Sequence, residues 1–89
     1  MSEHELRVRV RSLIHDRASV PSAEITSTCV LSVDLGYDSL SLIELVDAIE
    51  ETFGLAAVGQ ETIATLETVG DVEALVLDML AGVAAEAAR

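Results

Sequence analysis

The clearest pattern in the sequence is an apolar stripe of helical period between residues 39 and 53. At about 100° per residue, side chains three or four positions apart share one face of an α-helix. The stripe consists of Leu42, Leu45, Val46, Ile49 and Phe53. It predicts a helix that buries this face. Gly54 is a suitable C-terminal stop, and either Asp38 or Ser39 can cap the start.

Two other segments carry stripes of the same kind. The first helix can be capped by Ser2 and should end near Arg17, because Pro21 and the residue before it disfavour helical continuation. Its stripe is Leu6, Val10, Leu13 and Ile14. The last helix is expected to start at Thr68, with Asp71 three residues on. Its stripe is Val69, Val72, Leu75, Val76 and Met79.

The segments between these helices are predicted to be mostly irregular. Residues 18–38 form a long loop in this interpretation, and residues 62–66 form a short helical turn. The four helical segments predict an all-α fold, a small antiparallel four-helix bundle with a long loop between the first and second helices. The 89 residues suffice for one domain. Its core should span residues 3–80, and the Ala-rich residues 81–89 should extend the last helix or fray.

The chain is strongly acidic, with a net charge of −11. Nucleic acid phosphates would be repelled by this charge, whereas partner proteins with basic docking patches would be attracted. The apolar stretches are too short to cross a membrane. The single cysteine, Cys29, excludes an internal disulfide and fits a cytoplasmic location. The two histidines lack companions at metal-ligand spacing, so no metal site is expected.

The face opposite the stripe of the 39–53 helix combines acidic and apolar side chains. It carries Leu40, Ile43, Glu44, Asp47, Glu50 and Glu51, with Ser39 at its N-terminal end. Acidic residues near a helix start are stabilising by themselves, so an ordinary solvated face is one interpretation. The exposed aliphatic side chains favour a transient docking surface, in which charges surround a small apolar patch. The pattern alone leaves both interpretations open.

Ser39 stands where the loop becomes the helix. The free N–H groups and the positive end of the helix dipole favour a phosphate at this point. Serine is also a favoured N-cap residue, and position alone favours capping. A catalytic serine would need a histidine and an acid as partners, and no such pattern surrounds Ser39.

The residues around Ser39 resemble the attachment motif of acyl carrier proteins. That family has Asp-Leu-Gly, one variable residue and then Asp-Ser-Leu, and this chain has the same order over residues 34–40. The resemblance continues through residues 44–46 and 49–53, and again through residues 68–72. It covers residues 3–82 of the chain.

The resemblance implies a non-catalytic carrier. Ser39, between Asp38 and Leu40, would receive 4'-phosphopantetheine from coenzyme A through a phosphopantetheinyl transferase, and the terminal thiol would hold acyl groups as thioesters. The implied partners are acyltransferases, ketosynthases and other acyl-processing enzymes with basic patches. The family's docking positions match Asp38, Leu40, Ile43, Glu44, Asp47 and Glu51, and Glu50 on the same face is expected to dock with them. The family's acyl-chain pocket matches Leu45, Val46 and Ile49. A carrier that exposes its docking helix to several partners is expected to be a monomer.

The chain also departs from carriers of fatty acid synthesis. Those carriers commonly have an acid just after Asp-Ser-Leu, where Ser41 stands, and another just before Asp-Leu-Gly, where Val33 stands. Residues 56–61 lack the Ile-Pro and the acids that are often found there. Together with Tyr37, these departures favour polyketide or related specialised pathways. Two alternatives are a peptidyl or aminoacyl carrier, which typically has Gly-Gly-x-Ser, and an unmodified interaction module with the same fold.

Overall fold

The computed structural model describes residues 2–20 and 24–87, without the side chains of residues 83–87. Its helices are α1 (Glu3–Arg17), α2 (Leu31–Leu35), α3 (Ser39–Phe53), α4 (Gln60–Ile63) and α5 (Val69–Ala87). Within the described residues, β structure is limited to an isolated antiparallel bridge between Val30 and Thr68. The predicted all-α fold is therefore confirmed.

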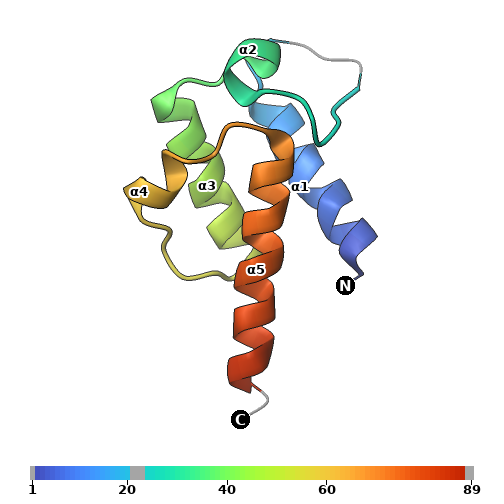
Figure 1. The fold of residues 1–89 in the computed structure, drawn as a ribbon, viewed down its shortest axis with the longest axis vertical. Helices are drawn as coiled ribbons and strands as arrows, with labels where there is room; N and C mark the ends of the chain where they lie inside the picture. The colour runs from blue at the N-terminus through green and yellow to red at the C-terminus, as the bar shows by residue number, and fades with distance from the viewer. Residues whose placement is uncertain (1, 21–23, 88–89) are drawn as a thin grey trace.

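The helices form an elongated bundle that measures 43 × 26 × 19 Å. α1 packs against both α3 and α5, and α4 packs against α3. Figure 1 shows that α1 runs opposite to α3 and α5, and that α2 lies over the end of the bundle where α3 and α5 begin. None of the helices in the described part of the chain combines the length and the apolar character that a membrane crossing needs.

The core is built from the predicted stripes. The most deeply buried members are Leu6, Val10 and Ile14 of α1, Leu45, Val46 and Ile49 of α3, and Val69, Val72 and Val76 of α5. None of these nine side chains is more than 4 % exposed. The remaining stripe members, Leu13, Leu42, Phe53, Leu75 and Met79, are half-buried at the margin. The helical registers expected from the sequence are therefore confirmed.

The loop between α1 and α3 is not wholly irregular, which corrects the prediction for residues 18–38. It contains α2, whose first and last residues, Leu31 and Leu35, are both buried. Gly36 ends this helix with a φ of 73°, and its N–H donates to the Leu31 carbonyl. A Cβ at Gly36 would lie only 2.9 Å from Cγ2 of Val20. Both the backbone angle and the close packing therefore require glycine at this position.

The other predicted boundaries differ from the structure by small amounts. α1 ends at Arg17 as expected, although Pro21 itself lies outside the described residues. α4 precedes the predicted turn by two residues, so only the first part of residues 62–66 is helical. α5 continues to Ala87, and the last two residues of the Ala-rich segment lie outside the described part of the chain.

Tyr37 ties the end of the loop to the end of α1. Its side chain is 5 % exposed, and its hydroxyl donates a 2.7 Å hydrogen bond to the carbonyl of Ile14. This carbonyl lies in the last turn of α1, where the N–H of Ala18 bonds to His15 instead. Tyr37 therefore supplies a partner to a carbonyl at the helix end. Burial raises the pKa of Tyr37 to about 12, because the ionised phenol would lose its solvation.

Replacing Tyr37 with Phe should lower the free energy of unfolding by about 1–3 kcal/mol, the usual cost of leaving a buried acceptor without its donor. In the wild-type protein the pKa of this phenol rises from 10.0 to about 12 on folding. The corresponding stability should be complete below pH 10 and lost as the pH rises toward 12. Urea unfolding of both proteins at neutral and alkaline pH measures the two effects. An identical alkaline loss in the Phe variant would contradict the role of Tyr37.

Candidate functional site

Ser39 is the first residue of α3, and its side chain is exposed. The N-cap position belongs to Asp38, whose Oδ1 accepts a 2.8 Å hydrogen bond from the N–H of Ser41. The hydroxyl of Ser41 accepts a 2.9 Å bond from the N–H of Asp38, which completes a capping box. Of the two capping residues that the sequence allowed, the structure therefore selects Asp38. The Ser39 hydroxyl forms no hydrogen bond with any residue that the structure describes.

The capping box also sets the charge beside Ser39. The bond from the Ser41 N–H is the main cause that holds the pKa of the Asp38 carboxyl below its usual range, and the Ser41 hydroxyl adds to it. Asp38 is therefore ionised at neutral pH, and its charge lies at the positive end of the α3 dipole. The cap stabilises the helix start without engaging the hydroxyl of Ser39.

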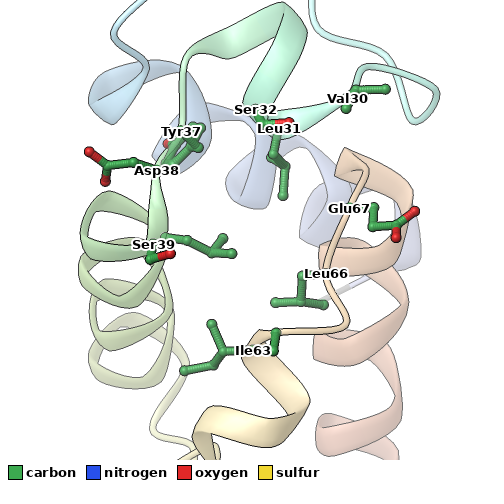
Figure 2. Close-up of a pocket in the computed structure, with 11 residues that line it drawn as sticks. Val30, Leu31, Ser32, Tyr37, Asp38, Ser39, Ile63, Leu66 and Glu67 are labelled. Atoms are coloured by element: carbon green, nitrogen blue, oxygen red, sulfur yellow. The ribbon is translucent and has the colours of Figure 1, made fainter.

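A cleft of about 520 Å³ opens beside Ser39 (Figure 2). We call it the Ser39 cleft; its lining residues are Val30, Leu31, Ser32, Tyr37, Asp38, Ser39, Leu42, Ile63, Ala64, Leu66 and Glu67. Figure 2 shows Leu31 projecting from the α2 side, and Ile63 and Leu66 from the α4 side, toward the same space. A smaller cleft of about 160 Å³ also includes Ser39 and continues toward Ile43 and Gln60. The exposed serine thus stands at the mouth of an opening that apolar and polar side chains line together.

The predicted docking residues lie along α3, beginning directly after Ser39. Leu40 is 66 % exposed and Ile43 is half-buried. The carboxylates of this face are exposed at Glu44, Asp47 and Glu51. Glu50 differs, because it is half-buried and its Oε2 accepts a 2.6 Å bond from the N–H of Val58. Its carboxylate holds the segment after α3 against the helix.

The residues predicted for an acyl-chain pocket lie deeper in the molecule. Leu45, Val46 and Ile49 are 0, 2 and 4 % exposed and belong to the core. None of them lines the Ser39 cleft or its smaller neighbour. Along α3 the lining ends at Leu42 and Ile43, so an acyl chain would have to separate core side chains to reach the three residues. Their role as a pocket stays a prediction.

Sequence reasoning missed the residues that do form the apolar wall of the Ser39 cleft. Leu31, Ile63 and Leu66 come from α2, from α4 and from the segment before α5. Each is less than 9 % exposed, so in the sequence each has the character of an ordinary core residue. An apolar side chain that lines an opening and one that fills a core have the same chemistry, and no local signal separates them.

Comparisons with known proteins identify the family. Residues 8–76 match the family described as a phosphopantetheine attachment site. The chain is 38 % identical over 88 residues to an acyl carrier protein from Saccharopolyspora erythraea, with 99 % of this chain and 92 % of that protein covered. It is 40 % identical over 76 residues to an acyl carrier protein from Akkermansia muciniphila, with 85 % and 94 % covered. A solved acyl carrier protein structure from Mycobacterium tuberculosis matches with a TM-score of 0.68 at 29 % identity, covering 85 % of this chain and 95 % of that one.

The chain belongs to the acyl carrier protein family, and it contains the family's phosphopantetheine attachment domain. The resemblance found in the sequence is confirmed at this level. Members are carriers and not catalysts, and their prosthetic group is a covalently attached 4'-phosphopantetheine. The family interacts with phosphopantetheinyl transferases and with acyl-processing enzymes in general.

Proposed function

We propose that Ser39 carries the 4'-phosphopantetheine arm, and that the protein presents acyl groups on it to the enzymes of a polyketide or fatty acid pathway. The observation that carries this proposal is the state of the Ser39 hydroxyl. It is exposed at the first position of α3, and Asp38 performs the capping that a serine there would otherwise provide. An oxygen that is exposed and not engaged is available to be modified.

The surroundings of Ser39 suit a phosphodiester. The first N–H groups of a helix and the positive end of its dipole favour an anion at this position. The Asp38 carboxylate beside Ser39 is already bonded to the N–H and the hydroxyl of Ser41, so the proton acceptor for the Ser39 hydroxyl would come from the transferase. When bound, the group supplies a thiol that holds acyl groups as thioesters. The chain itself supplies the anchoring oxygen, the adjoining cleft and the docking surface.

The attachment is tested by intact-protein mass after incubation with coenzyme A, magnesium and a broad-specificity phosphopantetheinyl transferase. The wild-type protein should gain one phosphopantetheine, and the Ser39→Ala variant should gain none. Ser32→Ala is the matched control, because Ser32 is a second exposed serine that lines the same cleft. It should be modified like the wild type.

Each other outcome favours a stated alternative. A folded wild-type protein that several transferases leave unmodified would favour the unmodified interaction module. A modified protein that accepts aminoacyl groups but no acyl groups would favour a peptidyl carrier.

The exposed face of α3 is the surface we propose for docking. It offers Leu40, with Ile43 partly accessible, beside the carboxylates of Glu44, Asp47 and Glu51. An apolar contact surrounded by charges of one sign suits brief, electrostatically steered encounters with basic patches. Glu50 is the weakest member of this proposal, because its carboxylate is already bonded to Val58.

Reversing the charge at both Glu44 and Asp47 to Lys should reduce turnover by partner enzymes about ten-fold or more, because like charges would then face each other in the encounter. Both positions are exposed, so the helical circular dichroism signal should not change. Asp78→Lys, at an exposed position of α5, is the charge control and should have little effect. Turnover of the acylated protein by a ketosynthase is the measurement. Normal turnover of the double variant would refute the docking assignment.

We further propose a polyketide or related specialised pathway in place of general fatty acid synthesis. Ser41 has a structural explanation, since its hydroxyl completes the capping box. Val33 is the more informative departure, because it is 78 % exposed where carriers of fatty acid synthesis commonly have an acid. An exposed valine in place of a charge favours partners with a different contact surface.

The pathway is tested by offering the malonyl-loaded protein to a polyketide ketosynthase and to a bacterial fatty acid ketosynthase. Condensation should be faster with the polyketide enzyme. Val33→Glu should raise the rate with the fatty acid enzyme about three-fold or more, because one charge at the rim of an interface can change the association rate by about this amount. Val8→Glu, at a valine of α1 that is 54 % exposed, is the matched control and should not. A wild-type protein that the fatty acid enzyme already prefers would contradict the assignment.

A further inference from the structure

α5 contains a fully buried carboxylate that its apolar stripe does not predict. Glu73 is 0 % exposed. Its Oε1 accepts a 2.7 Å hydrogen bond from the Ser27 hydroxyl and a 3.1 Å bond from Nη1 of Arg7. Its Oε2 accepts a 2.9 Å bond from Nε of Arg11. A buried acid needs such partners, and here they come from α1 and from the loop that precedes α2.

Arg11 and Ser27 connect the buried acid to this loop. Nη2 of Arg11 donates a 2.9 Å hydrogen bond to the Ser27 hydroxyl, and Nη1 of Arg11 donates a longer bond of 3.4 Å to the Ile25 carbonyl. The Ser27 hydroxyl donates to Glu73 while it accepts from Arg11, so its orientation is fixed by two partners. The side chains of two helices thus hold one point of the loop.

The same serine begins a stretch of backbone pairing that leads to the Ser39 cleft. The Ser27 carbonyl accepts a 2.8 Å bond from the N–H of Gly70, and the N–H of Leu31 donates a 2.9 Å bond to the Glu67 carbonyl. A Cβ on Gly70 would lie 3.0 Å from the Ser27 carbonyl oxygen. The loop therefore approaches the start of α5 at a distance for which glycine is the best residue.

This stretch ends in one wall of the cleft. Val30, Leu31 and Ser32 line the Ser39 cleft from the α2 side, and Glu67 lines it from the segment before α5. Figure 2 shows this wall across the opening from Ser39. We propose that Glu73 is a positioning residue, which holds the α2 wall of the cleft in place through Ser27 and Arg11. The importance of this wall for a 4'-phosphopantetheine arm rests on the proposed function of Ser39.

A role in stability alone explains Glu73 less well. Burying a carboxylate against two guanidinium groups has a desolvation cost, and well-packed apolar residues of similar volume often stabilise a core as much. The neighbouring buried positions of α5 are in fact valines, at Val69, Val72 and Val76. The ionic cluster adds directional bonds, which apolar side chains lack, and these fix the position of the loop.

Three variants separate positioning from general stability. Ser27→Ala removes the loop's hydroxyl and leaves Glu73 paired with both arginines. Glu73→Gln keeps the shape of the side chain and removes its charge. Glu3→Gln is the matched control, since Glu3 bonds the same Arg7 at 2.9 Å but from an exposed position.

Amide hydrogen exchange of the unmodified protein reports the position of the wall. The N–H of Leu31 bonds to the Glu67 carbonyl, and the N–H of Tyr37 bonds to the Leu31 carbonyl. The amide of Ile49, in contrast, lies in the middle of α3. In Ser27→Ala and Glu73→Gln, the amides of Leu31 and Tyr37 should exchange about ten-fold faster or more, and that of Ile49 should not change. Glu3→Gln should match the wild type at all three amides.

Two results would overturn the proposal. Equal acceleration at all three amides would mean that Glu73 serves global stability, and unchanged exchange at Leu31 would mean that the wall is held without it. The transferase mass assay on the same samples tests Ser39 separately. A protein that shows the expected exchange pattern but gains no phosphopantetheine would refute the proposed attachment and leave the positioning role of Glu73 in place.

Discussion

The hydrogen bond from the Ser41 N–H to the Asp38 carboxylate determines how the start of α3 can be used. A helix start must find partners for its first N–H groups, and serine at that point commonly provides one. Here the acid before the helix provides it, at 2.8 Å. Ser39 is therefore left exposed with a hydroxyl that the cap does not need. The same bonds keep the pKa of Asp38 low, so the cap retains its charge at neutral pH.

The position of Ser39 also depends on how the preceding loop is fastened. Near its end, Tyr37 is bonded to the last turn of α1, and α2 buries two leucines against the core. Near its middle, Ser27 is bonded to Glu73, while the adjoining backbone pairs with the residues that open α5. A loop in a small domain would otherwise retain considerable conformational entropy. These polar and apolar contacts give the Ser39 cleft a defined wall.

The sequence predicted the parts of this structure that depend on local pattern. The stripes of α1, α3 and α5 extend over several turns, so their period is detectable, and the attachment motif is a contiguous run. α2 was not predictable in this way, because a five-residue helix holds only one pair of buried leucines. The hydrogen bonds of Glu73 were not predictable for another reason. Its partners Ser27, Arg11 and Arg7 lie 46, 62 and 66 positions away from it in the chain. Only the fold brings these residues together.

The distribution of charge explains why the acidic face of α3 keeps its field. Between residues 18 and 88 the sequence contains no lysine or arginine. The arginines of α1 lie on a helix that packs against α3 and α5, and two of them, Arg7 and Arg11, are committed to Glu73. α3, α4 and α5 therefore contribute no cation that could neutralise Glu44, Asp47 or Glu51. In a chain with a net charge of −11, this face therefore presents carboxylates without a cation from its own helix, which is the arrangement that speeds an encounter with a basic partner surface.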